Sequence, residues 1–184
     1  MVRLLRTQIA FGQLPNFRIV HFCVQSNHLH LIAEADGKLA LADGVKRTKT
    51  RIARRLNRAL HRSGSFFDQR YHRRSLSTPR EVRNALCYVI NNERHHADER
   101  GEVLPATWFD PFSSAPWFDG WSAPLLIDEP WKKTVTQIPR PTELARTWLL
   151  RVGWKRHGLI AVDEVPARHA TKAKKRQKRR SRDV

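Results

Sequence analysis

Residues 17–32 read FRIVHFCVQSNHLHLI, two apolar runs separated by the polar turn residues 25–27. The β-rich composition of residues 17–24 predicts a central strand, and residues 28–33 predict a second strand that pairs with it as an antiparallel hairpin. Side chains alternate between the two faces of a strand. We therefore expect His28 and His30 on one face, with Leu29 and Leu31 on the apolar face opposite.

Two histidines side by side on a strand have two interpretations. Neutral imidazole is a common metal ligand, so His28 and His30 would make half of a metal site. The chain contains nine histidines, however, and a solvated pair that arises by chance is the alternative. Further ligands elsewhere in the chain are needed to choose between the two.

Helices are predicted before and after the hairpin along the chain. Residues 2–13 favour a short helix, which Pro15 ends, and residues 36–61 favour a long amphipathic helix. Between the long helix and the next one, residues 66–76 are expected to contain a loop and another strand.

The clearest helix start in the chain is the sequence Thr78-Pro79-Arg80-Glu81. Thr78 is the expected N-cap, Pro79 takes the first helical position, and Glu81 completes a capping box. This helix is predicted to run to about His95. His95 and His96 at its end are interpreted as solvated.

The chain is strongly basic, with 35 Lys and Arg against 17 Asp and Glu and a formal net charge of +18. Such a charge favours a polyanionic partner bound in a salt-sensitive way, with a structural ribosome-type protein as the alternative. The two cysteines, Cys23 and Cys87, lack a CxxC partner and are expected to be buried thiols. No apolar run is long enough to cross a bilayer, so a cytoplasmic protein without a membrane partner is expected.

The composition changes after Gly101, which suggests three parts. Residues 1–100 are the expected catalytic domain. Residues 101–165 are rich in Trp and Pro and predict an irregular extension, with a terminal helix opened by Pro141. Within it, Trp-Phe-Asp occurs at 108–110 and again at 117–119, and packing is a more natural role for these aromatic residues than stacking on bases. Residues 166–184 predict a basic, disordered tail.

Tyr88 and Asn92 lie four residues apart on the capped helix, one turn apart on one face. A tyrosine hydroxyl is a weak nucleophile that becomes useful when a metal polarises its target phosphate. The Asn92 amide oxygen can complete a metal shell begun by His28 and His30, and this donor set suits Mg²⁺ or Mn²⁺. A tyrosine at the edge of the core is the alternative reading of Tyr88.

These blocks, in this order, resemble the HUH single-tyrosine transposases, especially the REP-associated tyrosine transposase group of insertion-sequence type transposases. The resemblance covers residues 10 to 97 and rests on residues 26–32, 52–57, 66–71 and 88–92. It implies an α+β, ferredoxin-like fold with an antiparallel sheet and helices on one face.

The resemblance also implies a chemistry. Tyr88 looks like the nucleophile, and His28, His30 and Asn92 look like the ligands of a divalent metal, Mg²⁺ or Mn²⁺. In the family the tyrosine attacks a phosphodiester of single-stranded or hairpin DNA, forms a 5′-phosphotyrosine and frees a 3′-OH. No nucleotide cofactor is needed, because the covalent link conserves the bond energy. We expect a monomer, with a homodimer as the alternative.

Basic residues near this constellation are the expected DNA contacts. Phosphate contacts position a strand without reading its sequence. The predicted contacts lie on the long helix and in the loop after it: Lys46, Arg47, Lys49, Arg51, Arg54, Arg55, Arg58, Arg70, Arg73 and Arg74. A solvated helix face is the alternative for each of them.

The sequence departs from the family pattern at two points. Family members usually carry a further strand before the first helix, and Glu93 replaces the proline that usually follows the asparagine. The first departure leaves a second hypothesis open: an N-terminally shortened, non-catalytic nucleic-acid-binding derivative. A plasmid relaxase or replication initiator is a weaker third reading, because those proteins carry longer chains.

Overall fold

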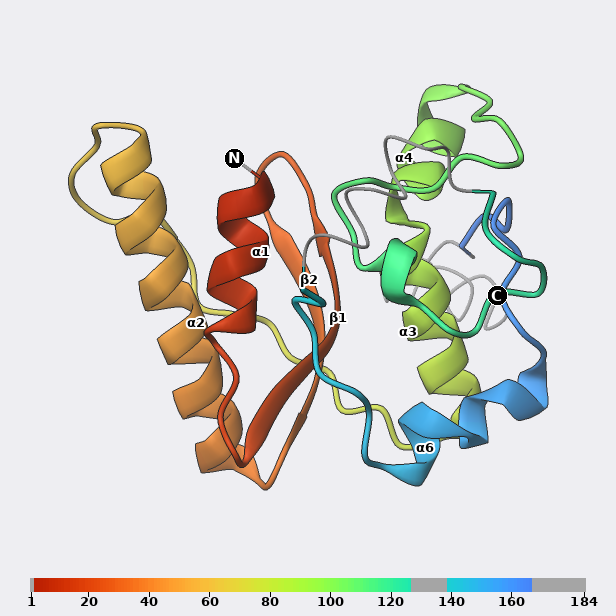
Figure 1. Ribbon diagram of the computed structural model, residues 1–184, viewed down its shortest axis with the longest axis horizontal. Coiled ribbons are helices and arrows are strands. Elements are labelled where there is room, and N and C mark those ends of the chain that lie inside the picture. Colours follow the sequence, from red (N-terminus) through yellow and green to blue (C-terminus); the bar gives the residue numbers. More distant parts are fainter. Residues whose placement is uncertain (1, 127–138, 167–184) are drawn as a thin grey trace, which may run out of the picture.

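The computed structural model describes residues 2–126 and 139–166. The elements are, in order, α1 (Val2–Ala10), β1 (Phe17–Val24), β2 (Leu29–Ala35), α2 (Lys38–Ala59), α3 (Pro79–Ile90), α4 (Asn92–Arg100), η1 (Ala115–Trp117), α6 (Trp148–Arg151) and η2 (Gly153–His157). The α+β class and the antiparallel sheet are confirmed, and the described part of residues 101–165 is the irregular extension expected (Figure 1). The basic tail lies outside the described residues, apart from Pro166.

The predicted hairpin forms the sheet. β1 and β2 pair antiparallel, and Cys23 lies opposite His30 near the turn. A register shift between Ile19 and His21 introduces an irregularity into β1. The ferredoxin-like sheet implied by the resemblance is represented, within the described residues, by these two strands.

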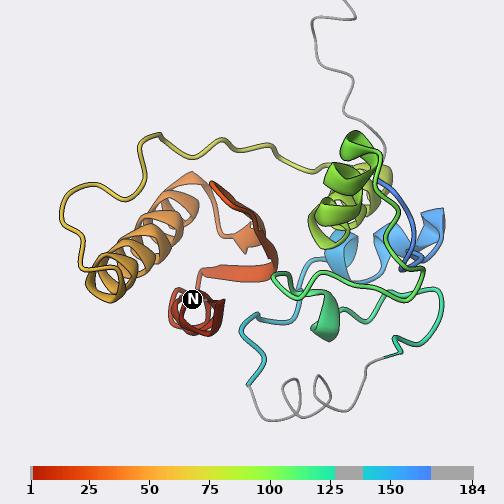
Figure 2. The same ribbon diagram turned by 90° about the horizontal axis from the view of Figure 1, so that it is seen from above.

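Helices cover both faces of the hairpin, so the expectation of helices on one face is wrong. α1 and α2 lie on one side of the sheet and α3 lies on the other (Figure 2). The reason is the burial of β1, where every residue from Phe17 to Cys23 is buried. Ile19 packs with α1 and α2, whereas Val20 packs with α3. A strand that is apolar on both faces needs a layer on each side.

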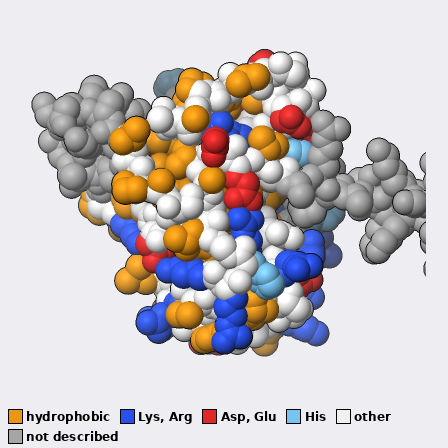
Figure 3. Space-filling model, turned by 90° about the vertical axis from the view of Figure 1, so that its right-hand side faces the viewer, with side chains coloured by type: hydrophobic (Ala, Val, Ile, Leu, Met, Phe, Trp, Pro, Cys, Tyr) orange, Lys and Arg blue, Asp and Glu red, His pale blue; other side chains and the backbone are white. Residues whose placement is uncertain are grey.

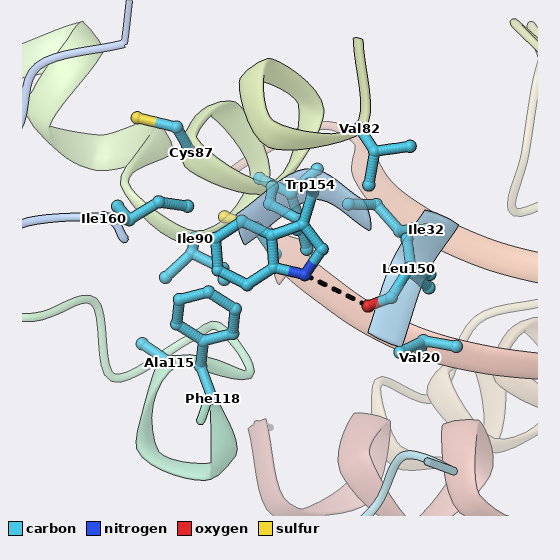
Figure 4. Packing of buried hydrophobic residues seen from close by; sticks show 13 residues of the cluster. Val20, Ile32, Val82, Cys87, Ile90, Ala115, Phe118, Leu150, Trp154 and Ile160 are labelled. Carbon is cyan, nitrogen blue, oxygen red and sulfur yellow. Dashed lines mark hydrogen bonds between the residues drawn. The ribbon is translucent and has the colours of Figure 1, made fainter. Parts of the chain in front are cut away.

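The extension completes the second layer. Phe118 and Trp154 stack with ring centroids 5.6 Å apart, in one cluster with Ile90 of α3. The indole nitrogen of Trp154 donates to the carbonyl of Leu150 at 3.1 Å (Figure 4). The second Trp-Phe-Asp segment thus contributes Phe118 to the core, as the packing interpretation predicts.

α3 begins as expected and ends earlier than expected. Thr78 is the N-cap, and the capping box with Glu81 is present. The predicted continuous helix to His95 is interrupted at Asn91, which has φ −104° and ψ 26°. The Asn91 side-chain amide donates to the carbonyls of Ala161 and Glu164. These long-range bonds, made by a residue that competes with helix formation, explain the break.

The strand expected within residues 66–76 does not form. Phe66 and Phe67 are both half-buried and pack on Leu5 of α1 and Ile52 of α2, instead of alternating between two faces. Residues 68–75 are all exposed. Residues 68–75 therefore have no apolar face to bury and form irregular chain without a strand.

The last helix is also shorter than expected, because it begins at Trp148 and not at Pro141. The amide of Glu143 donates to the carbonyl of Ile19 in β1 at 2.9 Å. The Glu34 carboxylate accepts from the backbone amides of Arg146 and Thr147. These bonds to the hairpin fix residues 143–147 as irregular chain before the helix starts.

Candidate active site

The two histidines of the hairpin converge on one point. His28 Nε2 and His30 Nε2 are 2.9 Å apart, and the ring centroids are 4.5 Å apart. Leu29 and Leu31 pack on the opposite face, toward α1 and α2, which confirms the predicted alternation. The hairpin therefore presents two ring nitrogens together on the side of the sheet that faces α3.

Asn27 orients the first imidazole. Its side-chain oxygen lies 2.6 Å from His28 Nδ1, and an amide oxygen only accepts. This contact places the proton of neutral His28 on Nδ1 and leaves the lone pair on Nε2, the arrangement seen in metal-binding histidines. Partial burial and the nearby His96 both lower the pKa of His28, which favours that neutral form.

Tyr88 meets this pair from α3. Its ring centroid lies 5.1 Å from that of His30, at an angle of 79°. The side chain is half-buried and packs against the core cluster shared by α3 and the extension. Tyr88 therefore stands at the edge of the core, as the structural alternative supposed, and beside the histidines, as the catalytic reading requires.

Asn92 is fully buried at the start of α4, and neither atom of its side-chain amide has a hydrogen-bond partner. A buried amide without partners is unfavourable and calls for an explanation. An ion bound to the Asn92 oxygen would give that atom a partner, although the amide nitrogen would still lack one.

The histidine geometry fits a metal as well. Two nitrogens at adjacent positions of an octahedral ion, each about 2.1 Å from it, are about 3 Å apart, close to the 2.9 Å between His28 and His30. The same separation also fits a hydrogen bond between the two rings. In residues 2–126 and 139–166, no group of three or more His, Cys, Asp or Glu side chains is arranged for a metal. The predicted third ligand, the amide of Asn92, belongs to a residue type outside these four.

Two further histidines, His95 and His96, lie in the same region, although the sequence predicts both to be solvated. His95 is buried, with 8% of its surface exposed, and its ring centroid is 5.9 Å from that of Tyr88. His96 lies close enough to His28 to lower the pKa of its imidazole. His95 follows Tyr88 by seven residues, which would be two turns of an unbroken helix. Because the helix is interrupted at Asn91, this spacing alone does not predict the contact.

Residues 10–92 match the family model described as transposase IS200 like. This part of the chain, 83 of the 184 residues, is similar to that family. The matched range begins in α1, contains the histidine hairpin, α2 and Tyr88, and ends at Asn92. Comparison with curated proteins gave no match, and neither did comparison with solved structures.

The similarity to IS200-like transposases supports a general role in DNA transposition, with DNA as the partner. The match of residues 10–92 also favours the class of DNA-cleaving enzymes. Within the described residues, no helix combines the length and the apolar character that a membrane span requires.

The basic residues predicted on α2 are placed away from Tyr88, because the sheet separates α2 from α3 (Figure 2). Several of them make contacts within the chain: Arg47 bonds the Phe11 carbonyl, Lys49 bonds the Gln69 carbonyl, and Arg51 stacks on Phe11. A hollow on the same helix is lined by acidic Asp43 as well as by basic side chains. The remaining predicted residues of α2 are exposed: Lys46, Arg54, Arg55 and Arg58.

The loop after α2 carries the other predicted contacts. Arg70 and Arg73 are exposed, whereas Arg74 pairs with Glu81 at 3.1 Å, next to the N-cap of α3. Basic charge is also present elsewhere, since Lys and Arg side chains gather in the lower half of the face in Figure 3. The positive charge is therefore spread over several surfaces of the molecule.

Proposed function

We propose that the hairpin and α3 form a metal-assisted tyrosine site that cuts and rejoins single-stranded or hairpin DNA. The observation that carries this proposal is the position of the Tyr88 ring beside His30, whose Nε2 is 2.9 Å from that of His28. A nucleophile of transposase type and a pair of metal-binding nitrogens thus meet on one face of the sheet.

His28, His30 and Asn92 would hold Mg²⁺ or Mn²⁺, which supplies a Lewis acid that polarises the phosphate. The Tyr88 oxygen attacks the phosphorus, and the bond between phosphorus and the 3′ oxygen breaks. The products are a 5′-phosphotyrosine and a strand that ends in a 3′-OH. Attack by a 3′-OH on the phosphotyrosine reverses these changes and joins strands, so no nucleotide cofactor is required.

The net charge of +18 supports a nucleic-acid substrate held through its phosphates. Arg70 and Arg73 are the predicted contacts of the loop that leads to α3 and remain exposed for such binding. The exposed residues of α2 belong to the opposite side of the sheet. We assign them to binding of flanking DNA, with no role at the reacting phosphate.

The test uses the only two tyrosines in the chain. Labelled hairpin DNA is incubated with the 184-residue protein and Mg²⁺ or Mn²⁺, and covalent adducts are separated on a denaturing gel. The wild-type protein and Tyr71→Phe are expected to form the adduct, and Tyr88→Phe is expected to form none. An adduct that persists in Tyr88→Phe disproves the nucleophile assignment.

A second outcome distinguishes the non-catalytic hypothesis. Salt-sensitive DNA binding with no adduct under any metal condition would identify a nucleic-acid-binding protein without strand-transfer activity. The binding is measured on the same samples by fluorescence anisotropy, so that loss of the adduct is separated from loss of DNA affinity.

A further inference from the structure

His95 is a buried imidazole on α4 that packs against the proposed nucleophile. The ring centroids of His95 and Tyr88 are 5.9 Å apart, with an angle of 54° between the planes. His30 contacts Tyr88 from the hairpin at 5.1 Å. The tyrosine ring is therefore flanked by one imidazole from β2 and one from α4.

The Glu99 carboxylate lies beside the rings of both His95 and His96. Its Oε1 lies 3.5 Å from His95 Nε2, and its Oε2 lies 3.1 Å from His96 Nδ1. The 3.5 Å contact is longer than a normal hydrogen bond. An ionised carboxylate at this position nevertheless favours the tautomer of His95 that carries its proton on Nε2, the ring nitrogen nearest to it. In that tautomer the lone pair is on Nδ1.

The Nδ1 atom of His95 is buried and has no hydrogen-bond partner. A buried polar atom without a partner is unfavourable and calls for an explanation. Use of the atom during the reaction, in a state that the resting protein does not show, provides one. A carboxylate, an oriented imidazole and a hydroxyl nucleophile form the arrangement by which enzymes activate weak nucleophiles. His96 is a poorer candidate, because its side chain is 30% exposed and its Nδ1 is already bonded to Glu99.

We propose that His95 is the general base for Tyr88 and that Glu99 is its positioning residue, an inference that rests on the proposed strand-transfer function. As the Tyr88 oxygen bonds to phosphorus, its proton passes to His95 Nδ1, and the departing 3′ oxygen takes a proton from water. In the reverse reaction the 3′-OH loses its proton to water as its oxygen bonds to phosphorus, and His95 returns its proton to the departing tyrosine oxygen.

The experiment measures the reactivity of the Tyr88 hydroxyl in two ways. The first is the rate of the DNA adduct. The second needs neither DNA nor metal: an aryl sulfonyl fluoride labels tyrosine oxygens with loss of fluoride, and peptide mass spectrometry gives the rate at Tyr88 relative to Tyr71. General bases contribute roughly 10²–10⁴-fold. We therefore expect His95→Gln to slow the adduct by about 100-fold or more and to slow labelling of Tyr88 but not of Tyr71.

Glu99→Gln is the second variant, and it sits on a side chain that is 48% exposed, so it tests the proposal even if His95→Gln does not fold. It should slow both reactions of Tyr88 by a smaller factor. Its matched control is Glu102→Gln, a nearby surface carboxylate that pairs with Arg100 and should change neither rate.

The outcomes separate this inference from the proposed function. Labelling of Tyr88 at the wild-type rate in both variants overturns the role of His95, whether or not the DNA adduct is affected. If the wild-type protein forms no adduct but labelling of Tyr88 depends on His95, the strand-transfer proposal fails and the assignment of the base stands.

Discussion

The backbone amide of Val24 donates to the carbonyl oxygen of Phe112 at 3.0 Å, so the extension lies along the edge of β1 that β2 does not cover. Two residues further on, the amide of Ser114 returns to the carbonyl of Phe22 at 2.9 Å. A strand edge without partners is prone to unwanted pairing. Residues 112–114 occupy this edge beside Cys23, the register partner of His30. The extension thereby supports the strand pair that carries the histidines.

Ser114→Ala tests this support. The Ser114 hydroxyl accepts from the amide of Phe22 at 3.1 Å and lies 3.2 Å from His21 Nδ1. Its removal leaves buried polar atoms unpaired, and we expect the free energy of unfolding to fall by about 1–3 kcal/mol. Urea denaturation measures the change. Ser122→Ala, at an exposed position, is the control and should be close to wild type. Equal stability of Ser114→Ala and wild type would contradict the prediction.

Gly44→Ala tests the contact of α2 with the other face of the hairpin. A methyl group at this position would overlap the buried ring of Phe17. Alanine gains about 1 kcal/mol of helix propensity over glycine, whereas overpacking of a core typically costs about 1–3 kcal/mol. Because the overlapping atoms belong to a rigid, fully buried ring, we expect net destabilisation in thermal unfolding. Thr50→Ala, on the exposed side of α2, is the control. An unchanged or raised midpoint for Gly44→Ala would show that the helix shifts freely.

Local signals in the sequence were sufficient for much of the fold. The hairpin, the long α2 and the Thr78 cap depend on alternation, amphipathic spacing and a capping box, all of which act over a few residues. The break at Asn91 depends instead on carbonyls of residues 161 and 164. The late start of α6 likewise depends on Glu34 in β2. No local pattern contains those contacts.

The candidate site was predictable in the same uneven way. Alternation along the strand placed His28 and His30 together, and order along the chain brought Tyr88 to them. The sequence predicts a solvated His95, because the polar residues 92–100 lack an apolar stripe. Its burial follows from its packing on Tyr88 across the break at Asn91, which the sequence does not reveal.

His21 predicts a pH dependence of stability. Burial lowers its pKa from 6.5 to about 3, assisted by the charge of Arg140. Above pH 6.5 the imidazole is neutral in both states, so its contribution to stability is complete. As the pH falls below 6.5, the unfolded chain takes up a proton that the folded protein does not bind until about pH 3. Stability is therefore lost in this window, on the order of 2 kcal/mol between pH 7.5 and 5.

The measurement compares urea unfolding of wild type and His21→Gln across that range. Glutamine can still bond to Ser114 but does not titrate, so its stability should fall less steeply between pH 7.5 and 5. His72→Gln, in the exposed loop, should follow wild type. Parallel curves for His21→Gln and wild type would show that His21 is protonated alike in the folded and unfolded states.

Metal binding gives the last prediction, because it separates ligands from the residue that orients them. His28→Ala removes a proposed ligand, and Mn²⁺ binding without DNA should no longer be measurable by calorimetry. Asn27→Ala removes the acceptor that fixes the His28 tautomer, and loss of such an outer partner weakens binding by about 10–100-fold. Asn84→Ala, on the exposed side of α3, should leave the affinity unchanged. If Mn²⁺ bound equally to wild type and His28→Ala, the ion would lie elsewhere, and the 2.9 Å approach of the two Nε2 atoms would be a hydrogen bond between neighbouring imidazoles.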